Sequence, residues 1–429
     1  MIELSRPEKL GLSADRLDRI ATHFDRYVDE GRIPGYLALV ARHGKATYCH
    51  CYGLRNVEAG HPVENDTIFR IYSMTKPVAS VGVLMLYERG LLQLDDPASE
   101  FIPEFKQLEV FESGDTEDYL TVPAEREMTI RDLLTHTSGL TYGHMHAHPL
   151  DAMYRQRKFL DDPAATLGEF VANLSKLPLL FSPGTLWGYS VATDVLGHVI
   201  EVISGKSLDR YCADEILEPL GMADTGFSVS PDRVARFAAN YEREGAGFRL
   251  IDKPEESTYL KLPNLCSGGG GLVSTAGDYL RFCLMLLNKG ELEGTRLLGR
   301  KTVELMTSNH LPGDCDLSSM GYLLYGDSRP ESVGMGFGAR HNLRRGGART
   351  ETRHDGVGFG LGGSVLLDPA AAQILGSPGE FGWGGAASTV FWVDPLEDIA
   401  VIFLTQLMPS SSYPIRRELR ILCNQAIVD

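Results

Sequence analysis

Segments with the patterns of β-strands lie near both ends of this 429-residue chain, and the segments between them are mostly helical. Strands are predicted at residues 36–42, 46–52, 358–367, 390–393 and 399–405, the first two forming a hairpin that turns at His43-Gly44-Lys45. Helices are predicted at residues 12–29, 165–175, 193–204, 276–288 and 414–427. Residues 308–356 show little periodicity and predict a long surface loop or flap. The order of these elements predicts one sheet built from both chain ends, with a helical lobe inserted.

Ser73-Met74-Thr75-Lys76 is the only Ser-x-x-Lys sequence in the chain, and it opens a predicted helix that stops at Gly90. A lysine three residues after a serine lies on the same face of a helix, one turn further along. A serine hydroxyl is a poor nucleophile until a base takes its proton, and a buried lysine can be that base. The tetrapeptide alone occurs by chance about once in a chain of this length, so its context decides the interpretation.

Gly188-Tyr189-Ser190-Val191-Ala192 is a competing serine motif, because it is close to the Gly-x-Ser-x-Gly nucleophile elbow of α/β-hydrolases. That elbow needs a buried strand directly before the serine. Here a turn, Ser182-Pro183-Gly184-Thr185, comes first. We therefore expect Ser73 rather than Ser190 to be the nucleophile.

Composition excludes several classes of partner. A net charge of −16 and a pI near 5.2 argue against nucleic acid and against an anionic membrane. The N-terminus lacks the apolar core of a signal peptide, and no apolar run approaches the ~20 residues of a spanning helix. Seven cysteines, an odd number, predict free thiols in a reducing cytoplasm.

No cofactor or metal is expected from the motifs. Gly358-Phe359-Gly360-Leu361-Gly362-Gly363 matches the dinucleotide pattern in letters, but it lacks the strand before and the helix after that phosphate binding needs. His144, His146 and His148 alternate in a polar stretch and could face one metal. Metal ligands usually sit on fixed elements with supporting hydrogen bonds, so we expect solvated or lid histidines instead.

Four further segments give Ser73 a context. They are Pro183-Gly184-Thr185 with Trp187, Tyr189 and Ser190; His136-Thr137-Ser138-Gly139-Leu140; Gly268 to Thr275; and Phe381-Gly382-Trp383-Gly384-Gly385-Ala386. In this order they resemble motifs of the serine β-lactamase and penicillin-binding protein superfamily, and they span nearly the whole chain. The chain departs from class C β-lactamases where Val191 replaces the asparagine of Tyr-x-Asn and Trp383 replaces the lysine of Lys-Thr-Gly. With these departures it resembles the family VIII carboxylesterases.

The resemblance implies an α+β fold of the β-lactamase/transpeptidase type. An antiparallel sheet flanked by helices is expected from residues 1–72 and 345–429, beside a mainly helical domain from residues 73–344. The active site is expected between these two parts.

The resemblance also implies roles for individual residues. Ser73 is expected to form an acyl-enzyme with a short-chain carboxylic ester, with Lys76 and Tyr189 sharing the general-base work. The pKa of a free lysine is about 10.4 and that of a free tyrosine about 10. The pKa of either residue must therefore fall by about 3 for it to act as a base at neutral pH. The sequence does not distinguish the two as base. The oxyanion is expected on the backbone N–H groups of Ser73 and Ala386, and substrate against Trp383, Gly384 and Gly385.

Other functions remain open at this point. The same scaffold serves β-lactamases, D-amino-acid peptidases and acyltransferases. A non-catalytic ligand-sensing or assembly protein is a further alternative, although an intact Ser73, Lys76 and Tyr189 argues for activity. The sequence does not indicate the acyl length, the natural ester or the oligomeric state.

Overall fold

One antiparallel sheet organises the computed structural model of the chain, which describes residues 2–157, 164–320 and 355–429. Its strands are β1 (Gly35–Arg42), β2 (Lys45–Asn56), β3 (His61–Pro62), β12 (Val357–Phe359), β13 (Ser364–Leu366), β14 (Phe381–Gly384), β15 (Val390–Asp394) and β16 (Ile399–Thr405). They run in the order β12-β13-β14-β15-β16-β1-β2-β3. At the junction β1 pairs antiparallel with β16, with Tyr36 opposite Thr405. The prediction of one sheet built from both chain ends is confirmed.

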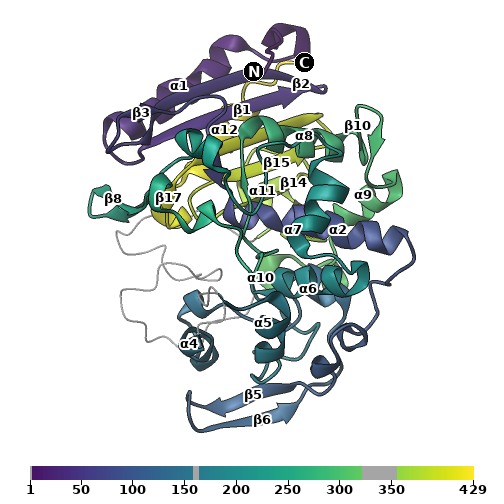
Figure 1. Cartoon of the computed structure of the whole chain (residues 1–429). Helices are drawn as coiled ribbons and strands as arrows, with labels where there is room; N and C mark the ends of the chain where they lie inside the picture. Colours follow the sequence, from purple (N-terminus) through teal and green to yellow (C-terminus); the bar gives the residue numbers. More distant parts are fainter. Residues whose placement is uncertain (1, 158–163, 321–354) are drawn as a thin grey trace.

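Helices surround this sheet and fill the middle of the chain (Figure 1). They are α1 (Ala14–Asp29), α2 (Thr75–Glu88), α3 (Ile130–Leu134), α4 (Pro149–Gln156), α5 (Leu167–Leu174), α6 (Ala192–Ser204), α7 (Leu208–Cys212), α8 (Ala276–Leu287), α9 (Arg300–Met306), α10 (Leu317–Met320), α11 (Pro369–Ala372) and α12 (Ile415–Asn424). Smaller strands are β4 (Phe69–Arg70), β5 (Glu109–Gly114), β6 (Tyr119–Pro123), β7 (Asn240–Glu244), β8 (Gly247–Asp252), β9 (Val273–Ser274), β10 (Glu291–Leu292), β11 (Thr295–Arg296) and β17 (Leu407–Met408). The five helices predicted above correspond to α1, α5, α6, α8 and α12.

The main sheet is covered on both faces, which explains why β1 is buried at every position and apolar from Tyr36 to Ala41. Successive side chains of a strand point to opposite faces. Tyr36 and Val40 pack in the core beneath α1 and α12, whereas Leu37 and Leu39 pack in the larger core on the other face. There α8 lies against β15 and β16, with the ring of Tyr279 at 4.9 Å from that of Phe391. A strand buried on both faces reads as a continuous apolar run rather than as an alternation.

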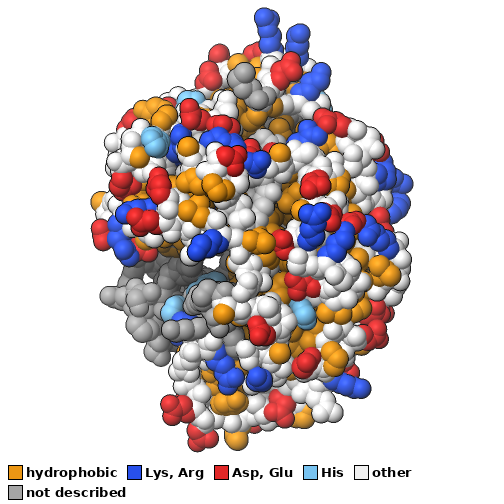
Figure 2. Space-filling view, viewed as in Figure 1, with side chains coloured by type: hydrophobic (Ala, Val, Ile, Leu, Met, Phe, Trp, Pro, Cys, Tyr) orange, Lys and Arg blue, Asp and Glu red, His pale blue; other side chains and the backbone are white. Residues whose placement is uncertain are grey.

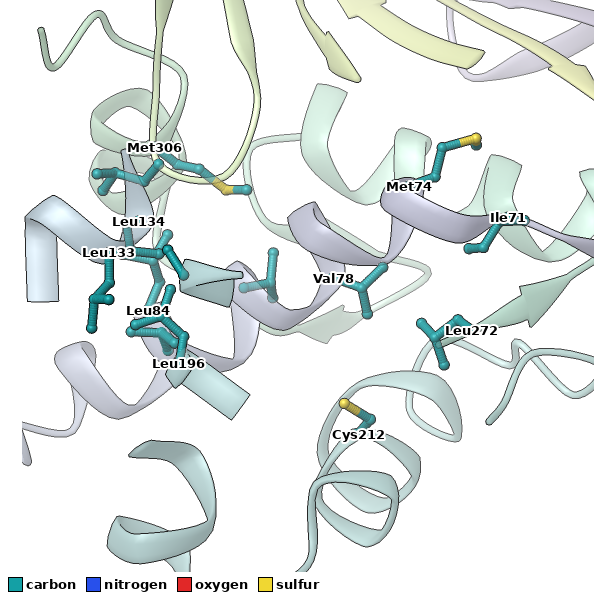
Figure 3. Packing of buried hydrophobic residues seen from close by; sticks show 14 of the residues in the cluster. Ile71, Met74, Val78, Leu84, Leu133, Leu134, Leu196, Cys212, Leu272 and Met306 are labelled. Carbon is teal, nitrogen blue, oxygen red and sulfur yellow. The ribbon is translucent and has the colours of Figure 1, made fainter. Parts of the chain in front are cut away.

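Helix α2 is the central helix of the larger core, and every residue from Thr75 to Leu86 is buried. Figure 3 shows Val78 and Leu84 of α2 surrounded by side chains from α3, α6 and α7 and by Leu272. A helix that is apolar on all sides belongs inside a protein. The helix that begins two residues after Ser73 and carries Lys76 is therefore packed on every side.

The prediction of one continuous strand at residues 358–367 is wrong, because this segment is the hairpin β12–β13. Gly362 has a φ of +98°, and the N–H of Gly360 donates to the carbonyl of Gly363 at 2.8 Å. A side chain at Gly362 would collide with Ser80 of α2. The glycines thus make a tight turn that packs against α2, and they do not form a phosphate-binding loop.

Part of the predicted surface loop can be described. Residues 308–320 hold a short 3₁₀ turn at Pro312–Asp314 and helix α10, and residues 321–354 lie outside the described residues. The domain boundaries given above stay a prediction. Helix α8, although it falls within residues 73–344, packs on the sheet.

The surface carries both charges. Acidic and basic side chains are interspersed on the face seen in Figure 2, so this face does not present one continuous basic surface. Within residues 2–157, 164–320 and 355–429, no helix has the length and apolar composition needed to cross a membrane. A cytoplasmic location stays a prediction.

Candidate active site

Ser73 lies in the 3₁₀ turn Tyr72–Met74, which leads directly into α2. Tyr72 has a φ of +44°, a conformation that costs a non-glycine residue about 1–3 kcal/mol. Surrounding contacts hold it there: Thr75 Oγ1 donates to the Tyr72 carbonyl at 2.6 Å, and Asn240 Nδ2 donates to the Tyr72 hydroxyl at 2.8 Å. The serine therefore sits on a strained, tightly supported turn at the start of the central helix.

Two proton-carrying side chains converge on the hydroxyl of Ser73. The Tyr189 hydroxyl donates to Ser73 Oγ at 2.8 Å, and Lys76 Nζ donates to the same atom at 3.3 Å. Lys76 is fully buried, and its Nζ also donates to the Tyr142 hydroxyl at 3.0 Å and to the Gly269 carbonyl at 2.7 Å. The fold thus brings together the three residues predicted for catalysis, although Tyr189 lies 116 positions from Ser73.

Tyr189 is held between a cation and an indole. Its ring lies 4.6 Å from Lys76 Nζ, a cation–π contact. On β14, Trp383 Nε1 donates to the Tyr189 hydroxyl at 3.3 Å, and the two rings have centroids 5.4 Å apart. The Trp383 ring in turn meets the edge of Phe359 at 5.2 Å. Trp383 is therefore a hydrogen-bond donor to Tyr189 as well as an apolar surface.

The end of β14 approaches the serine turn closely. A side chain at Gly385 would collide with the carbonyl of Ile71, and one at Gly384 would collide with the guanidinium of Arg416. The N–H of Gly385 donates to the carbonyl of Thr389 at 2.9 Å, which closes the turn that contains Ala386. Backbone atoms block a side chain at Gly385, whereas the group near Gly384 is the end of the flexible Arg416 side chain. The assignment of oxyanion donors to Ser73 and Ala386 stays a prediction.

Ser190 does not share this environment. Its Oγ lies 3.1 Å from His136 Nδ1, and both side chains are buried. Burial lowers the pKa of His136, and the positive charge of Lys76 adds to this shift. Ser190 follows a loop rather than a strand, and the main sheet is antiparallel, whereas the nucleophile elbow needs a strand directly before the serine. The α/β-hydrolase interpretation of Ser190 is therefore excluded by the fold.

The three alternating histidines do not converge. His144 stacks on Tyr142 with ring centroids 4.6 Å apart, whereas His148 caps α4 by accepting from the N–H of Leu150 at 3.1 Å. Burial lowers the pKa of His144 to about 4, and the charge of Lys76 acts in the same direction. Among the described residues, no group of three or more His, Cys, Asp or Glu side chains could hold a metal ion.

Sequence reasoning missed two side chains of this site, Tyr142 and Asp194. Burial raises the pKa of Tyr142 well above its ordinary value, and the charges of Asp194 and Tyr189 raise it further. Asp194, in the first turn of α6, accepts from the backbone N–H of Gly269 at 3.0 Å and from Ser267 Oγ. Tyr142 follows the His-Thr-Ser-Gly-Leu segment by two residues, which is the one signal that could have found it.

Such a convergence is the arrangement expected of the serine β-lactamase superfamily: a serine in the turn before the central helix, a lysine at the start of that helix, and a tyrosine from a distant loop. Comparison with known proteins agrees. The beta-lactamase family model matches residues 20–425. Esterase EstB of Burkholderia gladioli is 33% identical over 91% of this chain and 90% of its own length.

Two further relatives extend the comparison. Monacolin J acid methylbutanoyltransferase of Aspergillus terreus is 29% identical over 95% of this chain and 94% of its own length. The solved structure of EstCE1, described as a hydrolase with promiscuous acyltransferase activity, has a TM-score of 0.74 and 27% identity, covering 97% of this chain and 98% of its own. The chain belongs to the beta-lactamase family, in the branch of the family VIII esterases.

Proposed function

We propose that the protein hydrolyses short-chain carboxylic esters through an acyl-enzyme on Ser73. The observation that carries the proposal is the pair of contacts at Ser73 Oγ, with the Tyr189 hydroxyl at 2.8 Å and Lys76 Nζ at 3.3 Å. A general base must lie within hydrogen-bond reach of the proton that it removes, and both groups do.

In the proposed reaction Ser73 Oγ attacks the ester carbonyl carbon, and its proton passes to the pair formed by Tyr189 and Lys76. The backbone N–H groups of Ser73 and Ala386 stabilise the negative charge on the carbonyl oxygen. The intermediate collapses, the C–O bond to the alcohol breaks, and the alkoxide takes the proton from the pair. Water then repeats the sequence on the acyl-enzyme and releases the acid. Each step uses groups of the chain and water alone.

Trp383 supports a neutral ester as the substrate. A β-lactam carries a carboxylate, and an unpaired charge is costly to draw from water. Class C β-lactamases place a lysine where this chain has Trp383, whose single N–H donor already contacts Tyr189. An ester has no such charge, and its acyl chain gains about 0.8 kcal/mol per buried methylene.

Acyl transfer is the second candidate function, and the relatives favour it. One is named as a methylbutanoyltransferase and another as a hydrolase with promiscuous acyltransferase activity. The chemistry differs in one step, because an alcohol replaces water as the group that attacks the acyl-enzyme.

The test compares kcat/KM for p-nitrophenyl butyrate with kcat/KM for a chromogenic cephalosporin. We expect efficient turnover of the ester and little of the cephalosporin, and the reverse order would make the protein a β-lactamase. Ser73→Ala should abolish ester hydrolysis, whereas Ser190→Ala, the matched control from the second serine motif, should keep a sizeable fraction. Adding a small alcohol separates the two candidates, because transfer predicts that a new ester forms in place of the acid.

A further inference from the structure

Asp194 is a buried carboxylate for which the reaction described above has no role. It is 1% exposed and lies in the first turn of α6, where the helix dipole favours negative charge. Its Oδ1 accepts from Ser267 Oγ and from the N–H of Gly269. Its Oδ2 is buried without a hydrogen-bond partner among the described residues. A buried charge in this state needs an opposite charge nearby.

Lys76 is that opposite charge, and Gly269 connects the two groups. The N–H of Gly269 donates to Asp194 Oδ1 at 3.0 Å, and the carbonyl of the same residue accepts from Lys76 Nζ at 2.7 Å. A side chain at Gly269 would lie 2.6 Å from Asp194 Oδ2 and 3.0 Å from the Tyr142 hydroxyl. Glycine at position 269 avoids both clashes and lets these groups close around the lysine.

The contacts of Lys76 match an ammonium group. Its Nζ has three acceptors, Ser73 Oγ, the Tyr142 hydroxyl and the Gly269 carbonyl, and an ammonium has three N–H donors. The carbonyl can only accept. The aromatic rings of Tyr142 and Tyr189 lie 5.4 Å and 4.6 Å from Nζ, and such contacts also favour a cation.

Other titratable groups that interact with Lys76 do not supply the negative charge. Burial lowers the pKa of His136 and of His144, so both are neutral near pH 7. Burial raises the pKa of Tyr142, so its phenol keeps its proton. Burial also raises the pKa of Asp194, while the charge of Lys76 and the bonds from Ser267 and Gly269 oppose this shift.

We propose that Asp194 is a positioning residue that, through Gly269, holds the Lys76 ammonium group against Ser73 and so sets the pH range in which Ser73 reacts. The assignment rests on the proposed function of Ser73 as nucleophile. Lys76 Nζ lies 4.6 Å from the centre of the Tyr189 ring, so its positive charge favours the tyrosinate over the phenol.

Asp194→Asn tests the assignment because it removes the charge and keeps an acceptor oxygen for Ser267 and Gly269. The rate of fluorophosphonate labelling of Ser73 is measured against pH, together with kcat/KM for p-nitrophenyl butyrate. Loss of an anion near Lys76 makes its ammonium easier to deprotonate, so the alkaline limb of the pH profile should move to lower pH by about one unit. On that limb the rate at a given pH should fall about tenfold, since one pKa unit is a factor of ten in the ammonium fraction. Asp194→Asn should have little further effect in a Lys76→Ala background.

Asp151→Asn is the matched control. Asp151 is as buried as Asp194 and accepts from Thr141 Oγ1 at 2.8 Å and from the N–H of His148 at 3.0 Å. We expect this control to lower the melting temperature and to leave the pH profile in place. A profile for Asp194→Asn that superimposes on the wild type after scaling, or full additivity with Lys76→Ala, would overturn the assignment. Failure to label Ser73 in the wild type would instead refute the proposed function.

Discussion

Replacing Trp383 by Phe separates the two roles that the structure gives this side chain. Phenylalanine keeps an aromatic ring facing Tyr189 and Phe359 but lacks the indole N–H. That N–H donates to the Tyr189 hydroxyl at 3.3 Å. If Tyr189 acts as a tyrosinate, the N–H bond to its charged oxygen stabilises the form that can accept the serine proton. If Trp383 is only an apolar wall for substrate, losing the N–H changes little.

The contact distance sets the size of the effect. A hydrogen bond to a charged group contributes about 1.5–3 kcal/mol, whereas one between neutral groups contributes about 0.5–1.5 kcal/mol. The Trp383–Tyr189 distance of 3.3 Å is longer than the usual ~2.9–3.0 Å, which favours the lower end of the charged range. Since about 1.4 kcal/mol is tenfold in rate, we expect Trp383→Phe to lower kcat about tenfold.

The assay is the steady-state hydrolysis of p-nitrophenyl butyrate, with kcat and KM measured separately. Trp392→Phe is the matched control, because Trp392 lies opposite Gly382 on the neighbouring strand β15 and is fully buried. Its indole nitrogen has no hydrogen-bond partner among the described residues. The control should lower the melting temperature and keep kcat. If Trp383→Phe keeps kcat within about twofold and raises only KM, the donor role is wrong and Trp383 acts as a wall.

Two further predictions concern the proton-transfer pair and the pH dependence of stability. Lys76→Ala and Tyr189→Phe should each slow ester hydrolysis by a factor of about 10² or more. The double variant should be little slower than the slower of the two single variants. Additive losses in the logarithm of the rate would mean that the two residues serve separate steps. Hydrogen bonds from Arg236, at 2.9 and 2.6 Å, lower the pKa of Asp224. The stabilisation by this ion pair is fully present above the pKa of Asp224 in the unfolded chain, and it disappears as the pH falls through the pKa in the folded protein. Asp224→Asn should therefore lower the melting temperature at pH 7 but not near pH 2. An equal loss at both pH values would contradict this role of Asp224.

The local sequence pattern was sufficient to predict many of the strands and helices. The strands at 36–42 and 399–405 carry apolar residues at successive positions, and the helices at 193–204 and 276–288 carry helical periodicity; both patterns come from near neighbours in the chain. The hairpin at Gly360 to Gly363 was missed because its cause is not local. The turn is set by its packing on Ser80 of α2, about 280 residues earlier.

The sequence by itself predicted that Ser73 and Lys76 lie side by side, because residues three apart at the start of a helix share one face. Tyr189 and Trp383 were found through motif order, not through periodicity. Only the tertiary structure decided that Trp383 donates to Tyr189, that Gly385 fits against Ile71, and that Asp194 faces Lys76 across Gly269. These contacts join segments that lie far apart in the chain. Which distant segments meet is decided by packing in three dimensions, and no local sequence pattern records it.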